Sequence, residues 1–459
     1  MTKIWLINAI EKNPKSYIDM KYNGLSLAYI SSYIKKYGSF DNVTITENGR
    51  FLSSKLINKI NPDIVGISAI TQNFNIAKRI ATKIKKEKDI PIIIGGYHIS
   101  ALPNNLTENM DVAVIGEGEQ TFLELLFLYE KNGLIKNKLS AIDGLAYWDG
   151  GRFIITPKRK LINPIDKIPF PDRKLLNNYS GSFYMFTSRG CPYSCSFCSS
   201  TAFWEKVRFF SAKYVVNEIK EIISNYNVNN ICFYDDLFIA NKRRVKDIGY
   251  LLKKEKIKIS FSCNVRANLI NNNMASLLKN MNITKVSLGI ESGSDKILKY
   301  LKGDSVTVNQ NSNAVNILKK YGFIVGASFI IGSPHETEKD IIKTLNFIKK
   351  SKIDVGETYI LIPFPNTKIW DYYKKNGIVN DSMNWDNIKI YFKDNIDRVI
   401  ITNRVSKERL IYFDGLFKKE WKKRYIKYLL FRAIKNPKEI IPYIHKTLNK
   451  KLIKSGVKK

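Results

Sequence analysis

Three closely spaced cysteines, Cys191, Cys195 and Cys198, are the residues of this chain best suited to metal or redox chemistry. They follow the spacing Cys-x3-Cys-x2-Cys, whereas Cys232 and Cys263 fall inside strand-like runs, where a buried free thiol is ordinary. A cubane 4Fe–4S cluster usually takes four cysteine ligands, so three local ligands would leave one iron open to a substrate. A structural zinc or ferredoxin site is the alternative, but zinc sites usually supply four ligands in paired groups.

The bulk composition bounds the class of protein. The 459 residues suffice for two or three domains, and 44% of them are hydrophobic, which suits a packed core. Lys and Arg number 75 against 41 Asp and Glu, and the resulting charge of +34 favours phosphates, anionic lipid surfaces or an acidic protein as partners. The N-terminus lacks the pattern of a secretory signal, and no apolar run approaches the roughly 18–20 residues that span a bilayer. We therefore expect a cytoplasmic protein, and the cysteine pattern suits a reducing compartment.

The elements around the cysteines predict an incomplete parallel barrel over residues 182–390. Six strand-like runs alternate there with amphipathic helical stretches, as in a partial (βα)6 barrel. The cysteine triplet directly follows the first run, at a carboxyl end, where such barrels place their active sites. The six runs are Phe183–Thr187, Asn230–Tyr234, Lys258–Asn264, Lys285–Ile290, Gly326–Ile331 and Gly356–Leu361.

Residues 1–135 predict a separate α/β domain of the Rossmann-like, flavodoxin-like class. Its five short strands, separated by helical stretches, are expected at Ile4–Ile10, Val43–Thr46, Ile64–Ile70, Pro91–Gly95 and Val112–Ile115. Ligands of an open parallel sheet bind outside the carboxyl ends of its strands, and glycine there lets the backbone approach a ligand closely. The candidate ligand-binding residues at these ends are Ser68, Gly95, Gly96, His98, Gly116 and Glu117.

Two further regions complete the chain. Residues 136–181 predict a hairpin turning at Asp149-Gly150-Gly151 and then an extended connector. Residues 391–459 predict a basic helical region, and residues 401–459 hold 18 Lys or Arg against 4 Asp or Glu. This region could lie on an anionic membrane surface, bind an acidic carrier protein or a phosphate-bearing substrate, or form a solvated cap on the barrel. Nucleic acid is disfavoured because no stacking platform or known binding module accompanies the charge. The apolar residues among these cations are Leu429, Leu430, Phe431, Ile440, Ile441 and Tyr443.

The cysteine spacing, with Phe197 before the last cysteine, resembles the motif of the radical SAM superfamily. The resemblance implies that S-adenosylmethionine (SAM) chelates the open iron, and that one electron cleaves it to methionine and a 5′-deoxyadenosyl radical. Similar motifs at the later strand ends extend the resemblance across residues 182–375. Two alternatives stay open, since Asp235 could cap a helix and Glu291 could form a salt bridge at the barrel mouth. By the resemblance, SAM would contact Phe197, Asp235, Arg266, Glu291 and Gly332.

An α/β domain before such a barrel resembles the cobalamin-dependent subgroup of that superfamily. The matching segments are Gly24-Leu-Ser-Leu-Ala-Tyr, Gly95-Gly96-x-His98, Gly116-Glu117-Gly118-Glu119 and Phe170-Pro-Asp-Arg173. The resemblance implies that cobalamin lies across the strand ends that carry the candidate residues named above. No Asp-x-His-x-x-Gly occurs, so no histidine is assigned as a lower axial ligand, and His98 could instead be a hydrogen-bonded loop residue. Because no cysteine precedes Cys191, a methylthiotransferase with a second cluster is disfavoured.

These resemblances imply a cobalamin-dependent radical SAM enzyme, most often a methyltransferase acting on an unactivated carbon or phosphorus centre. A 4Fe–4S cluster, SAM and cobalamin would be its cofactors, and a flavodoxin or ferredoxin would donate the electron. The substrate would be a small or lipid-like molecule. A radical cyclisation or ring contraction without methyl transfer, and a cobalamin or iron–sulfur sensor without turnover, are the alternatives. A sensor would not need the SAM pocket that the barrel motifs imply.

Overall fold

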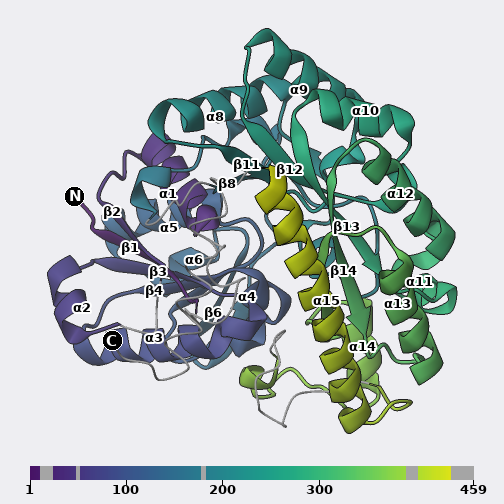
Figure 1. Cartoon of the computed structure of the whole chain (residues 1–459). Coiled ribbons are helices and arrows are strands. Elements are labelled where there is room, and N and C mark those ends of the chain that lie inside the picture. Colours follow the sequence, from purple (N-terminus) through teal and green to yellow (C-terminus); the bar gives the residue numbers. More distant parts are fainter. Residues whose placement is uncertain (11–23, 48–51, 177–181, 389–401, 436–459) are drawn as a thin grey trace, which may run out of the picture. The chain divides into compact units, whose positions relative to one another are not determined.

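The computed structural model describes residues 1–10, 24–47, 52–176, 182–388 and 402–435 (Figure 1). Its contacts divide the chain into two compact units, each of which joins segments distant in sequence. The first unit comprises Met1–Ser260 with Ile362–Ile401, and the second comprises Phe261–Leu361 with Thr402–Lys459. In the described ranges no helix combines the length and the apolar character needed to cross a bilayer.

The N-terminal sheet of the first unit has the strand order β2-β1-β3-β4-β5-β6-β7. Its first five strands are parallel: β1 (Ile4–Asn8), β2 (Val43–Thr46), β3 (Ile64–Ser68), β4 (Ile92–Gly95) and β5 (Val112–Val114). The order 2-1-3-4-5 is that of flavodoxin-like folds, as predicted. Helices α1 (Leu25–Gly38) and α5 (Gly118–Asn132) cover one face, while α2 (Ser54–Ile60) and α3 (Phe74–Glu87) lie on the other (Figure 1). Because both faces are covered, the residues of β3 and β4 are almost continuously buried.

The predicted hairpin is present as β6 (Leu145–Asp149) and β7 (Arg152–Ile155), and it turns at Gly150 and Gly151. Both glycines have positive φ, +54° and +80°, as a two-residue hairpin turn with right-handed twist requires. Strand β6 pairs antiparallel with β5, so the hairpin extends the N-terminal sheet. Two short helices, α4 (Tyr97–Ala101) and α6 (Lys136–Leu139), lie in the loops of this sheet.

The second sheet has six strands, in the order β15-β14-β13-β12-β11-β8, as expected for the partial barrel. They are β8 (Ser182–Met185), β11 (Asn230–Phe233), β12 (Ser260–Val265), β13 (Ile283–Glu291), β14 (Ile324–Ile331) and β15 (Val355–Ile360). Side-chain caps mark where all but one of the helices named next begin, the exception being Asp295–Lys302, and Thr307 and Thr337 each form a capping box. These helices are α8 (Ala212–Asn225), α9 (Lys242–Lys254), α10 (Asn272–Asn280), α11 (Asp295–Lys302), α12 (Val308–Lys320), α13 (Glu338–Lys350) and α14 (Lys368–Lys375).

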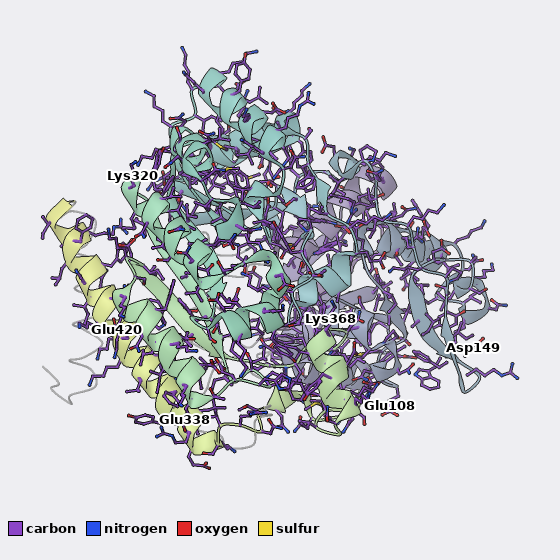
Figure 2. The ribbon with its side chains drawn as sticks, turned by 90° about the vertical axis from the view of Figure 1, so that its right-hand side faces the viewer. Glu108, Asp149, Lys320, Glu338, Lys368 and Glu420 are labelled. Atoms are coloured by element: carbon purple, nitrogen blue, oxygen red, sulfur yellow. The ribbon has the colours of Figure 1, made fainter. Side chains whose placement is uncertain are left out.

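Helix α15 (Lys407–Lys435) packs on β15 in the second unit and confirms the predicted C-terminal helix over these residues. Its buried side chains Leu410, Phe413, Phe417 and Trp421 recur on one face. Trp421 lies directly over Gly356, where a Cβ would meet its ring at 2.6 Å. Figure 2 shows α15, marked by Glu420, beside α13, marked by Glu338. The predicted tail residues Ile440, Ile441 and Tyr443 lie outside the described residues.

Candidate functional site

The three cysteines lie on a loop closed at its base by a short antiparallel pair, β9 (Ser188–Arg189) and β10 (Arg208–Phe209). We call residues 190–207 the cysteine loop; it begins after β8 and includes α7 (Ser199–Trp204). Cys191, Cys195 and Cys198 are all partly exposed, and the Cys198 amide donates a hydrogen bond to the Cys195 carbonyl at 3.1 Å. Phe197, between the last two cysteines, is also partly exposed.

Burial and neighbouring groups shift the pKa values of two of the three thiols. Burial raises the pKa of Cys191 to about 11, opposed by the Tyr193 amide, while Asp236 and the other two cysteines raise it further. Burial likewise raises the pKa of Cys198, against hydrogen bonds from nearby backbone amides. Amides that hydrogen-bond cysteine sulfur stabilise thiolates and are one of the protein's means of tuning an iron–sulfur cluster. In the described ranges, no group of three or more His, Cys, Asp or Glu side chains converges closely enough to hold a single metal ion.

Asp235, predicted to contact SAM, is fully buried and holds the start of the loop. Its Oδ1 accepts the amides of Thr187 at 2.5 Å and Ser188 at 3.1 Å, and Oδ2 accepts the Thr187 hydroxyl. The Arg244 guanidinium lies 3.6 Å from Oδ2 and donates to the Thr187 carbonyl at 2.8 Å. Both carboxylate oxygens of Asp235 thus bind Thr187 and Ser188, and neither oxygen caps a helix. The neighbouring Asp236 is exposed and accepts the Ser200 hydroxyl.

Glu117 and Glu119, in the loop after β5 and the first turn of α5, meet two arginines from the base of the cysteine loop. Arg189 donates to Glu117 at 2.7 Å and to Glu119 at 2.6 Å. Arg208 donates to both oxygens of Glu117, at 2.7 and 2.9 Å, and the Ile162 amide adds a further bond at 3.0 Å. Burial alone would raise the pKa of Glu117, but the hydrogen bond and charge of Arg208 and the charge of Arg189 hold it below its ordinary value. The carboxylate therefore stays ionised and faces the arginines.

The other predicted residues of the N-terminal sheet divide into two groups. Ser68, Gly95 and Gly116 are partly exposed at the ends of β3, β4 and β5, and a Cβ at Gly116 would meet no atom within 4 Å. At Gly95 the nearest atom to such a Cβ is Val114 Cβ at 3.9 Å. Gly96 is different, because a Cβ there would lie 2.5 Å from the carbonyl oxygen of Ala69. Open space for a ligand thus lies at Gly95 and Gly116, whereas Gly96 is required by the adjacent backbone.

His98 is fully buried and does not present its ring to a ligand. The imidazole stacks on Phe74 with ring centres 3.9 Å apart, meets Trp385 edge-on at 4.5 Å, and pairs with Asn105 at 3.2 Å. Burial lowers the pKa of His98 to about 4, so the ring is neutral at physiological pH. The environment fits the alternative of a hydrogen-bonded loop histidine. Trp385 also donates to Asn105 at 3.0 Å, which joins residues 384–388 to the connection between β4 and β5.

The remaining predicted residues, Arg266, Glu291 and Gly332, lie in the second unit. Arg266, after β12, donates to Ser305 Oγ at 2.6 Å. Glu291 ends β13 at a bulge with φ +64°, a conformation that costs a non-glycine residue energy and is enriched at functional sites. Its buried carboxylate lies 3.4 Å from Lys302 Nζ, so Glu291 does form a salt bridge, as the alternative interpretation expected. Burial nevertheless raises the pKa of Glu291. Gly332, with φ +84°, directly follows β14.

Comparison with known proteins accounts for both parts of this arrangement. The family model of the radical SAM superfamily matches residues 185–348, and the family model of the B12 binding domain matches residues 24–126. A protein named as an uncharacterised methyltransferase, from Pyrococcus horikoshii, is 35% identical over 375 residues, which cover 79% of this chain and 80% of the relative. The chain belongs to the radical SAM superfamily.

Two other comparisons agree with this assignment. The anaerobic magnesium-protoporphyrin IX monomethyl ester cyclase of Rubrivivax gelatinosus is 27% identical over 77% of this chain and 68% of the relative. The solved structure of the radical SAM methyltransferase TsrM from Kitasatospora setae shares the fold. It has a TM-score of 0.67 at 16% identity, covering 82% of this chain and 75% of that one.

Membership of the radical SAM superfamily implies a 4Fe–4S cluster and SAM as cofactors, and the B12-binding domain implies cobalamin. The radical SAM match contains the cysteine loop, and the B12-binding match contains the sheet ends with their open glycines. The donor set fits both groups, because thiolates are the ligands of iron–sulfur clusters and glycines leave room beside a sheet for a large planar ligand.

Sequence reasoning missed Glu336, which shapes the end of β14 in this radical SAM domain. It is fully buried, and its Oε2 accepts the amides of Gly332 at 2.5 Å and Ser333 at 3.0 Å. Burial raises the pKa of Glu336 to about 8, although these two amides lower it. The signal was available in the sequence as Gly332-Ser-Pro-His-Glu336, but a carboxylate after Pro334 is typical of a helix start and does not by itself predict burial.

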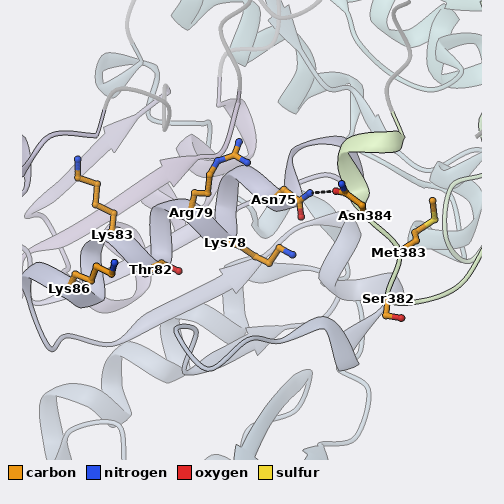
Figure 3. A pocket seen from close by; sticks show the side chains of 9 residues that line it. All are labelled: Asn75, Lys78, Arg79, Thr82, Lys83, Lys86, Ser382, Met383 and Asn384. Atoms are coloured by element: carbon orange, nitrogen blue, oxygen red, sulfur yellow. Dashed lines mark hydrogen bonds between the residues drawn. The ribbon is translucent and has the colours of Figure 1, made fainter. Parts of the chain in front are cut away.

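An open groove of about 750 Å³ lies elsewhere in the first unit, between α3 and residues 382–384 (Figure 3). Four cations of α3 line it, and Asn75 donates to Asn384 across one end at 2.8 Å. None of the residues predicted for cofactor binding lines the groove, so we do not assign it to the cofactor site. The four cations are Lys78, Arg79, Lys83 and Lys86.

Proposed function

We propose that this protein is a cobalamin-dependent radical SAM methyltransferase. The observation that carries the proposal is the direct connection, within one compact unit, between the cysteine loop and the end of β5 in the B12-binding domain. The 35% identity to a relative named as a methyltransferase favours methyl transfer over the alternatives. The protoporphyrin ester cyclase among the relatives keeps radical cyclisation as the second candidate.

Each part of the chain takes one role in this proposal. Cys191, Cys195 and Cys198 hold the cluster, and Phe197 lines it. Gly95 and Gly116 leave room for cobalamin beside Ser68, while Gly96 and His98 shape the loop from within. When bound, the cluster and SAM supply radical formation by one-electron cleavage, and cobalamin supplies methyl transfer. The chain orients these groups and excludes water.

The residues predicted to contact SAM are assigned more specific tasks. Arg266, Glu291 and Gly332 would line the SAM site of the second unit, with Glu336 holding the turn at Gly332 through two amides. Asp235 would act indirectly, because its hydrogen bonds position Thr187 and Ser188, which precede the cysteine loop. The strained backbone of Glu291 supports a binding role, since such strain persists only where the surrounding structure imposes it.

Two partners complete the reaction. A one-electron donor such as flavodoxin or ferredoxin would reduce the cluster, and a small or lipid-like molecule would accept the methyl group at an unactivated carbon or phosphorus centre. We place the reaction in the cytoplasm.

The end of α15 supports a peripheral contact with an anionic membrane. Arg424 donates to the carbonyls of Ile353 at 2.6 Å and Ser351 at 3.3 Å, which fixes the helix to the second unit up to that point. Beyond it, Leu430, Phe431 and Ile434 are 61%, 56% and 82% exposed, among the cations of the same turns. Exposed aliphatic and aromatic side chains beside Lys and Arg suit a membrane interface, where each cation adds about 1 kcal/mol.

Anaerobic reconstitution tests the proposed function. The chain would be loaded with iron, sulfide and hydroxocobalamin, reduced, and given SAM carrying a deuterated methyl group. We expect cobalamin to remain bound through gel filtration and 5′-deoxyadenosine to accumulate. Deuterium in a small-molecule product would support methyl transfer, whereas 5′-deoxyadenosine with no labelled product from any candidate substrate would favour the cyclase alternative. A chain that retains no cobalamin and cleaves no SAM would contradict the proposal.

A further inference from the structure

One carboxylate of the B12-binding domain holds both ends of the cysteine loop. Arg189 and Arg208 are directly opposite each other on β9 and β10, and each donates to Glu117 Oε1 at 2.7 Å. Arg208 also reaches Oε2, so its guanidinium grips the carboxylate with two bonds. A two-point contact of this kind fixes orientation as well as distance. The residues that flank the cysteine loop, Arg189 and Arg208, therefore both bind Glu117.

A second contact joins the B12-binding domain to the same loop. Tyr97 follows Gly95 and Gly96 at the end of β4, and its hydroxyl donates a hydrogen bond to the Pro365 carbonyl. The ring of Tyr97 lies 6.1 Å from that of Phe203 in α7. Each of the two open strand ends of the B12-binding domain is thus followed by a side chain that contacts the cysteine loop or its base: Tyr97 packs against Phe203, and Glu117 binds Arg189 and Arg208.

Stability alone is a weak reason for this arrangement. Glu117, Glu119 and Arg189 are each less than a tenth exposed, and removing such charges from water costs free energy that their attraction offsets only in part. Apolar side chains of similar volume would fill the same space at least as favourably. A buried ion pair does hold its two side chains in one arrangement, because moving either partner leaves an unpaired charge in the interior. Here the ion pair between Glu117 and Arg189 links two neighbouring residues: Gly116 precedes Glu117 by one position, and Cys191 follows Arg189 by two.

We propose that Glu117 is a positioning residue that couples cobalamin binding to cluster binding. A cluster held by the cysteines fixes the loop, which fixes Arg189 and Arg208, and these hold Glu117 and the neighbouring Gly116 in the form that receives cobalamin. The second cofactor then meets an ordered site and loses less conformational entropy on binding. Because coupling is reciprocal, cobalamin favours the cluster to the same extent. The inference rests on the proposed function, since both cofactors must bind.

Titration with hydroxocobalamin, on the full chain with and without its reconstituted cluster, measures the coupling as the ratio of two Kd values. We expect the cluster to tighten cobalamin binding roughly tenfold in the natural chain. In Glu117→Gln, which keeps the shape but loses the charge, the ratio should fall to about one. Glu124→Gln is the matched control, because Glu124 lies in α5, the helix that follows Glu117, and pairs with Arg159, which is outside the cysteine loop. Its ratio should stay that of the natural chain.

The ratio separates positioning from a purely structural role. A structural loss would weaken cobalamin binding equally with and without the cluster and leave the ratio unchanged, which would overturn the inference. A ratio near one in the natural chain would overturn it as well, while leaving cobalamin binding and the proposed function intact. No cobalamin binding in either form of the natural chain would remove the proposed function itself. Should Glu117→Gln not fold, Arg208→Lys, which keeps the charge but lacks the two-point fork, must lower the ratio instead.

Discussion

Replacing Gly96 by alanine should destabilise the first unit in the absence of any cofactor. Gly96 has φ +101° and ψ −177°, a region populated essentially by glycine alone, and an alanine there costs about 1–3 kcal/mol. Its Cβ would also lie 2.5 Å from the oxygen and 3.0 Å from the nitrogen of Ala69. Both are backbone atoms beyond the end of β3 and can move only with the chain, which adds roughly 1–3 kcal/mol. The sum of about 2–6 kcal/mol is a large part of a domain's usual stability.

Gly116 isolates the effect of a side chain on the ligand. It shares a positive φ of +82°, but a Cβ there has no neighbour within 4 Å. Gly116→Ala should therefore cost only the backbone strain, about 1–2 kcal/mol, while its methyl group enters the open space at the end of β5. Gly133, which follows α5, has φ +70° and equally open surroundings. Gly133→Ala is thus the matched control for backbone strain away from the strand ends.

Calorimetry of the cofactor-free chain and titration with hydroxocobalamin distinguish these effects. We expect Gly96→Ala to lower the melting temperature of the first unit by several degrees more than Gly133→Ala, at roughly 2–4 °C for each kcal/mol. Gly116→Ala should melt like Gly133→Ala but bind cobalamin more weakly. Equal melting of Gly96→Ala and Gly133→Ala would refute the contact with Ala69. Equal cobalamin affinity of Gly116→Ala and Gly133→Ala would remove the strand end from the cobalamin site.

Three further predictions concern the cluster, the second unit and α15. Alanine at any thiol of the cysteine loop should abolish 4Fe–4S absorption and SAM cleavage, whereas Cys232→Ala should keep its iron; iron loss there would make the three-ligand assignment wrong. The pKa of Glu336 is raised from 4.5 to about 8, so its stabilisation is complete below about pH 4.5 and disappears as pH rises through 8; denaturant titrations should show Glu336→Gln without this slope, and an unchanged slope would contradict the assignment. Combined Leu430→Ser and Phe431→Ser should reduce sedimentation with anionic vesicles at low salt, while Ile411→Ser, at an exposed site near the start of α15, should not; full recovery of the natural chain in every supernatant would eliminate the membrane contact.

Local patterns in the sequence were sufficient to predict the elements and the cysteine loop. The parallel strands of both sheets are short apolar runs that alternate with helical periodicity, the pattern of a parallel sheet with covering helices. The cysteine spacing depends only on neighbouring residues, so it could be recognised without a fold. Chain segments distant in sequence were harder, because residues 384–388 contact the segment between β4 and β5 through Trp385, which no local pattern indicates.

Side-chain direction was the part that the sequence could not provide. Glu117 and Asp235 stand at strand ends, where ligand contacts are common, yet each carboxylate turns inward to an arginine or to backbone amides. The partners of Glu117 come from 72 and 91 positions further along the chain, so its orientation depends on tertiary structure alone. His98 is equally a tertiary result, since Trp385 closes its environment from the far end of the chain.

At the strand ends of the N-terminal sheet, the glycines and the polar residues that follow them have different roles. At two strand ends, Gly95 and Gly116 leave space beside the sheet, and a polar residue after each binds the protein: Tyr97 donates to the Pro365 carbonyl, and Glu117 accepts from Arg189 and Arg208. In the proposed function cobalamin would occupy the space beside these two glycines, which leaves the Glu117 carboxylate to connect the domain to the base of the cysteine loop. On this reasoning, conservative changes at Glu117 should alter how the two cofactors influence each other before they prevent either from binding.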